Sequence, residues 1–174
     1  MLKAIAGKLI GRAERRLGVG LDYVRHIAAT DIGLLSRYNR FFSFLDGNRH
    51  VPPAAYHTAR IRGALTADCG ACVEIEVNLA RTAGLTPALI NNALDGRSED
   101  AAIAAVIALC DAVVRDRMDD ADARETIRAA WGEPALSELA YAMNGAAMVP
   151  GIMRAMGYAT ACDATLMERL RKGQ

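Results

Sequence analysis

Aromatic residues are scarce in this chain, and their scarcity narrows the fold class. Phe, Trp and Tyr together make up 5% of the 174 residues, although 52% of the residues are hydrophobic. Most of the hydrophobic residues are Ala, Leu, Ile, Val and Met, which suit closely packed helices better than a β-sandwich. A chain of this length buries roughly 70% of its unfolded surface. The sequence therefore predicts an all-α, single-domain helical bundle over residues 1–174.

The chain also lacks a strong net charge and a long apolar run. Lys and Arg number 21 and Asp and Glu number 20, so the net charge of +1 offers no general attraction to nucleic acid. Charges interrupt the apolar stretches before they reach the ~18 to 20 residues that a membrane span needs. No continuous apolar block near the start suggests a secretory signal. We therefore expect a soluble, cytoplasmic protein that binds neither nucleic acid nor a membrane.

The first predicted helix, over residues 2–17, is amphipathic. Its apolar residues recur at helical spacing and are expected to face the core: Leu2, Ile5, Leu9, Ala13 and Leu17. The same segment carries five basic residues: Lys3, Lys8, Arg12, Arg15 and Arg16. Because of these charges, a role at a membrane surface is the alternative to packing.

The chain contains no internal repeat, low-complexity tract or flexible linker, so its helix breakers divide one compact domain. Helices are predicted at residues 2–17, 21–29, 31–45, 53–66, 69–83, 87–94, 99–117, 120–131, 134–147 and 151–170. Gly84 is expected to end one helix in a left-handed conformation, and Thr86 and Ser98 are expected to cap the next two. The apolar run at 101–108 predicts a central helix or a subunit contact.

A Cys69-Gly-Ala-Cys72 motif stands at the predicted start of the helix over 69–83. In an intracellular chain, this spacing is typical of a redox dithiol or of half a metal site. No second Cys-x-x-Cys or His-x-His pair is present to complete an ordinary zinc site, which favours redox chemistry. Unpaired amides and the helix dipole would stabilise a thiolate at Cys69. Cys110 and Cys162 have apolar neighbours and are expected to fill the core.

Two residues are candidates for moving protons at this dithiol. Glu76 follows Cys72 by one helical turn. If the helices on either side of residue 67 form an antiparallel hairpin, His57 and Glu76 lie at nearly the same level, given a rise of ~1.5 Å per residue. Such a pair can accept and orient a thiol proton. Alternatively, His57 lies on the surface, and Glu76 pairs with a nearby arginine, the candidates being Arg60, Arg62 and Arg81.

A zinc module is a second hypothesis from a different class of function. It would use one pair of sulfur ligands with a nitrogen and an oxygen ligand, namely Cys69, Cys72, His57 and Glu76. The number of ligands suits a structural zinc site. Against it, His57 would have to reach across the hairpin.

The run from His57 through the cysteine motif, Glu76 and the segment 78–86 (Asn-Leu-Ala-Arg-Thr-Ala-Gly-Leu-Thr) resembles the AhpD-like alkylhydroperoxidase and carboxymuconolactone decarboxylase family. The resemblance covers about residues 53–95. It implies an all-helical homo-oligomer that reduces hydroperoxides or small disulfides without a cofactor or metal. A separate thiol reductant would restore the dithiol.

The resemblance also implies a role for each residue of the motif. Cys72 would be the attacking thiolate and Cys69 the resolving thiol, with His57 and Glu76 as the proton relay. The family usually places Glu twelve residues before the first cysteine and His four after the second, so the acid and the base are exchanged in this chain. We thus expect a thiol-dependent peroxidase or disulfide oxidoreductase. A non-redox enzyme resembling the decarboxylase branch is a further alternative.

Overall fold

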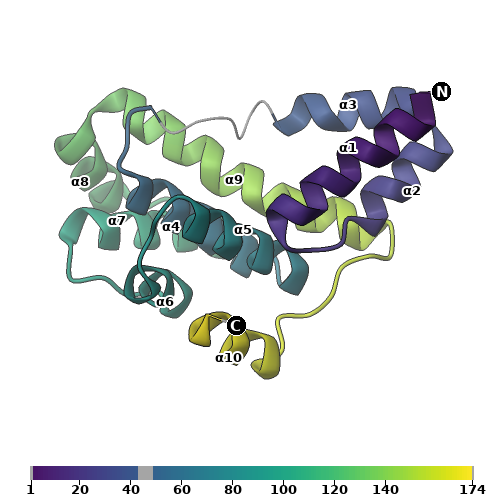
Figure 1. Ribbon diagram of the computed structural model, residues 1–174. Coiled ribbons are helices and arrows are strands. Elements are labelled where there is room, and N and C mark those ends of the chain that lie inside the picture. Colours follow the sequence, from purple (N-terminus) through teal and green to yellow (C-terminus); the bar gives the residue numbers. More distant parts are fainter. Residues whose placement is uncertain (1, 43–48, 174) are drawn as a thin grey trace.

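The computed structural model describes residues 2–42 and 49–173, and every regular element within them is helical (Figure 1). The predicted all-α bundle is therefore confirmed. The helices are α1 (Leu2–Leu17), α2 (Asp22–Thr30), α3 (Ile32–Phe42), α4 (Pro53–Thr66), α5 (Gly70–Thr82), α6 (Pro87–Asp95), α7 (Ala101–Cys110), η2 (Asp111–Asp116), α8 (Ala121–Trp131), α9 (Glu133–Ala155) and α10 (Ala164–Lys172). The last three residues of the helix predicted over 31–45 lie outside the described residues.

The prediction of two helices at 134–147 and 151–170 is wrong. A single helix, α9, runs from Glu133 to Ala155 with Pro150 inside it, and residues 156–163 are not helical. An interior proline costs a helix about 3 kcal/mol because it removes a backbone donor. Here Pro150 is buried, and Met143 and Met153 anchor the helix in the core on either side of it. Packing of α9 therefore outweighs the local preference for a break.

The helix predicted over 99–117 begins later than expected and changes its form near the end. Asp100 caps α7, because its carboxylate accepts from the amides of Ala102 (2.8 Å) and Ile103 (3.1 Å). The predicted cap at Ser98 is wrong, since its hydroxyl instead accepts from the amide of Asp100 (3.2 Å). After residue 110 the helix widens into the π-helical turn η2. Six of the ten residues of α7 are buried, so this helix packs into the bundle along most of its surface.

Two other predicted helix signals are confirmed between α5 and α6. Gly84 adopts φ +86°, a left-handed conformation that residues with a Cβ rarely adopt. The Thr86 hydroxyl then accepts from the amide of Leu89 at 3.3 Å and caps α6. These two residues turn the chain sharply, so that α6 packs against both helices of the α4–α5 hairpin.

Helix α4 is the central element of the bundle. It packs most extensively against α9 and also contacts α5, α6 and α7. Figure 1 shows α9 as a long diagonal helix that passes beside α4 and α5. Gly63 permits the close approach, because a Cβ at this position would collide with the carbonyl group of Met143 and stand 3.3 Å from the Cβ of Ala146. Helix α9 therefore packs closely on α4, which is the first helix of the predicted antiparallel α4–α5 hairpin.

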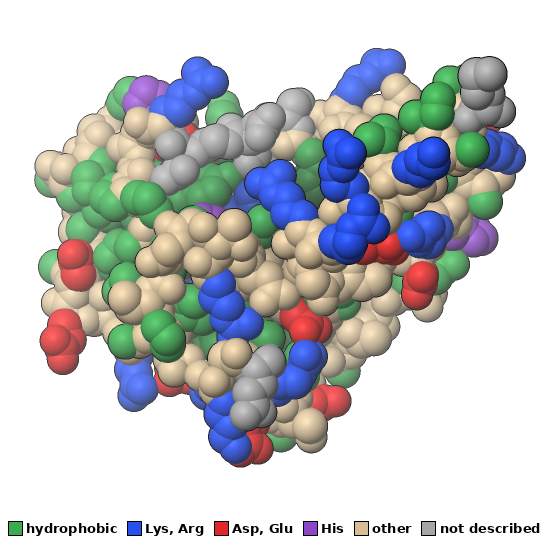
Figure 2. All heavy atoms as spheres, viewed as in Figure 1, with side chains coloured by type: hydrophobic (Ala, Val, Ile, Leu, Met, Phe, Trp, Pro, Cys, Tyr) green, Lys and Arg blue, Asp and Glu red, His purple; other side chains and the backbone are tan. Residues whose placement is uncertain are grey.

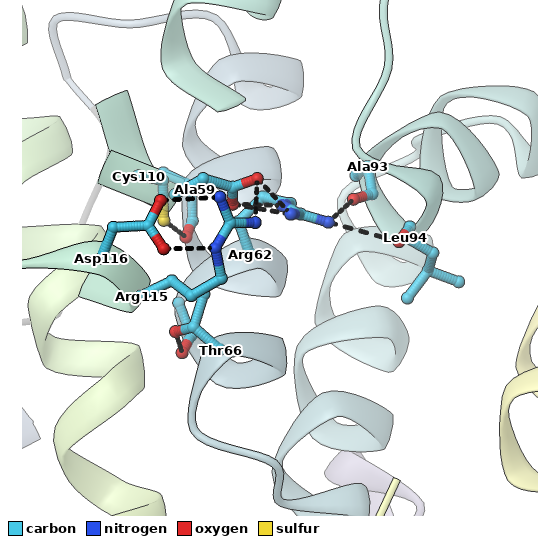
Figure 3. Close-up of polar contacts among 10 residues, drawn as sticks. Ala59, Arg62, Thr66, Ala93, Leu94, Cys110, Arg115 and Asp116 are labelled. Atoms are coloured by element: carbon cyan, nitrogen blue, oxygen red, sulfur yellow. Dashed lines mark hydrogen bonds and ion pairs between the residues drawn. The ribbon is translucent and has the colours of Figure 1, made fainter. Parts of the chain in front are cut away.

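A partly buried polar contact ties α4 to α6 and η2 (Figure 3). Arg62 donates to the Asp111 carboxylate at 2.6 and 2.9 Å and to the carbonyl oxygens of Ala93 (3.4 Å) and Leu94 (3.3 Å). Next to it, the buried Cys110 thiol donates to a backbone carbonyl of α4 at 3.7 Å. Burial, together with the Asp111 charge, raises the pKa of Cys110 to about 12. Cys110 is thus an unreactive core residue, as predicted.

The predicted orientation of α1 is largely wrong. Leu2, Ile5 and Leu9 are 69%, 50% and 58% exposed, whereas Ala6 and Ile10 are the buried residues of this helix. In the first part of the helix, the core-facing positions therefore come one residue later than expected. Ala13 and Leu17, the remaining predicted core residues of α1, are partly buried against the core. In the described part of the chain, no helix is both long and apolar enough to cross a bilayer.

Candidate functional site

The two cysteines of the motif lie at the start of α5. Cys69 is the N-cap residue, with an extended backbone (φ −127°, ψ 100°), and Cys72 follows within the first turn. Their Cα atoms are 5.2 Å apart and their sulfur atoms lie at disulfide-bonding distance. This Cα separation falls within the usual range for disulfides. The two cysteines are therefore placed so that their sulfur atoms can form a disulfide at the start of α5.

The backbone amides at the start of α5 already have partners. Gly70 donates to the carbonyl oxygen of Thr160 at 2.8 Å, and Ala71 donates to the Thr160 hydroxyl at 3.3 Å. The expectation that unpaired amides stabilise a thiolate at Cys69 is therefore wrong for these two groups. The positive end of the helix dipole still lies at Cys69, so a smaller stabilisation of negative charge remains.

Both sulfur atoms are enclosed by protein. Cys69 is fully buried and Cys72 is 4% exposed. The sulfur atom of Met153, on α9, lies 3.4 Å from the Cys72 sulfur and 4.0 Å from the Cys69 sulfur. The polarisable thioether thus fills the space directly against the dithiol and keeps water from it.

The segment between α9 and α10 covers the motif. A Cβ added to Gly70 would stand 2.7 Å from the carbonyl oxygen of Ala161, a backbone atom of this segment, so only glycine fits under it. Asp68 fastens the same segment, because its carboxylate accepts from the amide of Cys162 at 2.9 Å. Arg154 donates to the Asp68 carbonyl oxygen at 2.7 Å. Residues just before and inside the motif therefore hold the C-terminal segment in place.

Cys162 lies at the edge of the site. It is half-buried and packs against the core cluster that contains Cys69 and Cys72, so its predicted core role is met only in part. Burial, together with the charge of the Asp68 carboxylate, raises the pKa of Cys162 to about 11. The thiol therefore remains protonated near neutral pH and is a poor nucleophile.

Glu76 pairs with Arg60, as the alternative of an ion pair with a nearby arginine predicts. Arg60 on α4 donates to both oxygens of the Glu76 carboxylate, at 2.6 and 2.9 Å, and also donates to the Tyr56 hydroxyl at 3.1 Å. Both partners are buried. Burial, the largest single effect, would lower the pKa of Arg60, but the charge and hydrogen bonds of Glu76, together with the contact to Tyr56, raise this pKa above its ordinary value. The pair is therefore a fixed, fully formed ion pair across the α4–α5 hairpin.

The predicted contact between His57 and Glu76 does not form. No hydrogen bond or ion pair joins the two among the described residues, because the longer side chain of Arg60, one turn along α4, reaches Glu76 instead. The alternative that His57 lies on the surface is also wrong, since it is 8% exposed and its Nδ1 atom has no partner. Burial, with the nearby Arg60 charge, lowers the pKa of His57 to about 4. Its imidazole is therefore neutral at pH 7.

The four residues of the zinc hypothesis do not form a ligand set. Within residues 2–42 and 49–173, no group of three or more His, Cys, Asp or Glu side chains is arranged to hold a metal ion. Arg60 occupies both oxygens of Glu76, which removes one of the proposed ligands. The donor set thus reduces to the two sulfurs at Cys69 and Cys72.

A cleft of about 640 Å³ opens elsewhere, between α2, α3 and the end of α9. Its walls are mainly apolar and include Tyr38, Phe41 and Ile152, with His26 and Arg37 as polar residues. None of the predicted site residues lines it. The cysteine motif and this cleft are therefore separate features, and no cysteine lines the cleft.

Several neighbours of the motif have no signal in the sequence. Met153 and Thr160 lie more than 80 residues from the cysteines along the chain, and only the tertiary fold brings them there. Arg60 could be anticipated, because it is a basic residue on the helix opposite Glu76. No family model matches the chain, and no curated protein and no solved structure is significantly similar to it. The resemblance to the AhpD-like family therefore stays a prediction.

Proposed function

We propose that the chain is a thiol-disulfide oxidoreductase whose Cys69 and Cys72 cycle between dithiol and disulfide, with a hydroperoxide or a small disulfide as the oxidant. The observation that carries the proposal is the placement of two sulfur atoms at bonding distance at the start of α5. Cys110 and Cys162 have raised pKa values, which argues against either as the nucleophile.

With a hydroperoxide as substrate, the reaction has two chemical steps. The Cys72 thiolate attacks one peroxide oxygen, the O–O bond breaks, and the alcohol leaves with a proton, so that Cys72 becomes a sulfenic acid. The Cys69 thiol then attacks the Cys72 sulfur and expels water, which forms the disulfide. Two equivalents of an external thiol reduce this disulfide and are themselves oxidised. A small disulfide would oxidise the pair by exchange through a mixed disulfide.

The ion pair of Arg60 and Glu76 supports this chemistry. An isolated carboxylate one helical turn from Cys72 would raise the pKa of the thiol and disfavour the thiolate. Because Arg60 holds both oxygens of Glu76, the positive charge offsets the negative one. In this proposal Glu76 is a positioning residue, and His57 accepts a proton as a neutral imidazole. The low pKa of His57 makes it a weak base, so slow thiolate formation is expected.

Enclosure of the sulfur atoms restricts the oxidant. Cys72 is nearly buried, and Met153 and the segment that carries Thr160 lie against the motif. A small hydroperoxide or disulfide requires only local displacement of this segment. A folded protein substrate would require the segment to leave altogether. Small oxidants are therefore the proposed substrates.

A thiol count tests the proposal. Fully reduced protein contains four thiols, and one equivalent of an organic hydroperoxide is expected to remove two of them. Cys72→Ser should abolish the rapid loss, whereas Cys162→Ser, the matched control for a neighbouring thiol, should still lose two. Peptide mapping should then place the disulfide between residues 69 and 72.

A second arm of the same experiment uses hydroxyethyl disulfide in place of the hydroperoxide. Loss of two thiols in this arm alone would identify a disulfide oxidoreductase without peroxidase activity. If wild-type protein keeps all four thiols in both arms, the proposed function is refuted.

A further inference from the structure

Charge is distributed unevenly along the chain in spite of its small total. Residues 1–42 contain eight Lys or Arg residues and only three acidic residues, whereas residues 43–174 contain 13 and 17. The acidic residues of the first segment are Glu14, Asp22 and Asp31. Such an asymmetry between parts of a chain is typical of a basic region that meets an anionic surface.

Helix α1 carries an apolar stripe that the fold does not cover. Leu2, Ile5 and Leu9 recur at spacings of three and four residues, so they share one face of the helix. All three are at least half exposed, because Ala6 and Ile10 take the contacts with the core. This exposed face is separate from the face that holds α1 on the bundle.

Basic residues continue and flank this stripe. Arg12 and Arg16 follow Leu9 at the same helical spacing, and Lys8 and Arg15 stand one position to the side. All four are exposed, and none makes an ion pair in the part of the chain that the structure describes. Figure 2 shows Lys and Arg side chains gathered over the N-terminal helices, with hydrophobic side chains among them.

We propose that α1 binds the surface of an anionic phospholipid bilayer and lies in the plane of the interface. Leu2, Ile5 and Leu9 would enter the boundary between headgroups and acyl chains, as in interfacial amphipathic helices. The four cations would contact the headgroup phosphates, and their long aliphatic stems would follow the apolar stripe into the interface. The proposal replaces the expectation of no membrane contact and takes up the alternative role of α1 at a membrane surface, because the three residues expected to face the core are exposed.

Two other partners fit the observations less well. Nucleic acid would satisfy the cations, but it would leave the aliphatic stripe exposed, and α1 has no aromatic side chain for stacking on bases. A second copy of the chain would cover the stripe, but face-to-face contact of two α1 helices would bring eight cations together without counter-charges. An anionic bilayer satisfies both the stripe and the charges. The proposal does not depend on the thiol chemistry.

Sedimentation with vesicles tests the proposal on the full chain. Wild-type protein should bind vesicles that contain phosphatidylglycerol and should bind pure phosphatidylcholine vesicles at least tenfold more weakly, as an order-of-magnitude expectation. Substituting Arg12→Gln, Arg15→Gln and Arg16→Gln together should weaken binding by about tenfold or more. Ile5→Gln with Leu9→Gln should also weaken it by roughly tenfold. Raising NaCl from 0.1 to 1 M, which shortens the Debye length from ~10 to ~3 Å, should reduce binding.

Matched variants elsewhere on the surface serve as controls. The triple variant Arg97→Gln, Arg117→Gln and Arg124→Gln removes the same charge, and Leu89→Gln with Met148→Gln removes two exposed apolar side chains. Both should bind anionic vesicles within about twofold of wild type, and circular dichroism should show folded protein throughout.

Equal binding by the α1 variants and the controls would overturn the proposal, as would absence of binding to anionic vesicles. Tighter binding to duplex DNA than to anionic vesicles would assign the basic face to nucleic acid and reject the bilayer. Loss of self-association in the α1 variants, without any vesicle binding by wild type, would assign the stripe to a second copy of the chain.

Discussion

Two helical hairpins in this protein carry the same kind of ion pair in different surroundings. In the α4–α5 hairpin, Arg60 donates through Nε and Nη2 to both oxygens of Glu76, and their side chains are 11% and 8% exposed. In the α1–α2 hairpin, Arg25 donates through the same two nitrogens to Glu14, and their side chains are 46% and 19% exposed. The chemistry of the two pairs matches, so burial is the main difference between them.

The difference shows what each pair contributes. Water competes for the groups of the outer pair and salt screens its charges, so such pairs add little to stability. The inner pair has lost its hydration, and each partner depends on the other to compensate its charge. A buried pair is often no more stable than a well-packed apolar substitute. Removing one partner is therefore costly, although the pair as a whole need not add to stability.

Of the variants that test this comparison, Glu76→Ala is expected to change the free energy of unfolding most. Removing Glu76 leaves the Arg60 charge buried without a partner, which should lower the free energy of unfolding by about 3 to 5 kcal/mol. Urea denaturation followed by circular dichroism measures this change. The double variant Arg60→Met with Glu76→Leu should recover most of the loss, because no uncompensated charge remains. A loss below about 1 kcal/mol for Glu76→Ala would mean that the pair is not buried as described.

His57 gives the α4–α5 hairpin a pH dependence in the range between pH 4 and 6.5. Its pKa falls from an ordinary 6.5 to about 4 in the folded protein, through burial and then the Arg60 charge. Between these values the unfolded chain binds a proton that the folded protein does not, so stability falls as the pH falls. The contribution is complete above pH 6.5, and about 3 kcal/mol is lost by pH 4, at 1.36 kcal/mol per unit.

His57→Gln removes the titrating group and keeps a polar side chain of similar size. Urea midpoints measured between pH 4 and 7 should therefore show a flatter profile for this variant than for wild type. Parallel profiles over this range would show that His57 does not have a depressed pKa in the folded protein.

Gly70→Ala tests whether the segment between α9 and α10 covers the cysteine motif. The added Cβ would stand 2.6 Å from Leu166 Cδ2 and 2.7 Å from the carbonyl oxygen of Ala161, and the backbone atom cannot easily move. We expect a loss of about 1 to 3 kcal/mol, which is typical of overpacking. In reduced protein, Cys69 and Cys72 should also react faster with a thiol reagent.

Gly151→Ala is the matched control, because a Cβ at this position in α9 meets nothing within 4 Å. It should leave thiol reactivity unchanged and stabilise the helix by up to about 1 kcal/mol. Equal thiol reactivity in Gly70→Ala and wild type would contradict the described packing of the segment on the motif.

The helices were predictable from the sequence because their signals are local. Thr86 caps α6 and Gly84 adopts a left-handed conformation, as their residue types predict. The helical rise per residue predicts that His57 and Glu76 lie at similar heights along the α4–α5 hairpin. The rise does not predict which side chain contacts Glu76. That depends on which of the side chains on the facing helix is long enough to reach the carboxylate. Arg60 is longer than His57 and forms two hydrogen bonds with Glu76.

The remaining features depend on contacts between distant parts of the chain. Pro150 is a strong local signal for a helix end, yet packing of α9 on α4 overrides it. Thr160 and Met153 reach the cysteine motif only after α9 has packed, so no spacing in the sequence marks them. The orientation of α1 was wrong for a related reason. An amphipathic pattern predicts that a helix has an apolar face but cannot decide between two adjacent apolar stripes.

Glu14→Ala, which removes the ion pair of the α1–α2 hairpin, should change the stability of the protein least. The hydrogen bond from Arg25, followed by that from the amide of Leu21, lowers the pKa of Glu14, so the pair is formed at neutral pH. Because the Arg25 side chain is 46% exposed and water competes for its hydrogen bonds, the urea midpoint should shift by no more than about a quarter of the shift for Glu76→Ala. In 1 M NaCl this shift should shrink, since the Debye length is then ~3 Å, whereas the shift for Glu76→Ala should persist. Equal shifts with equal salt dependence for the two variants would show that burial does not distinguish the two pairs.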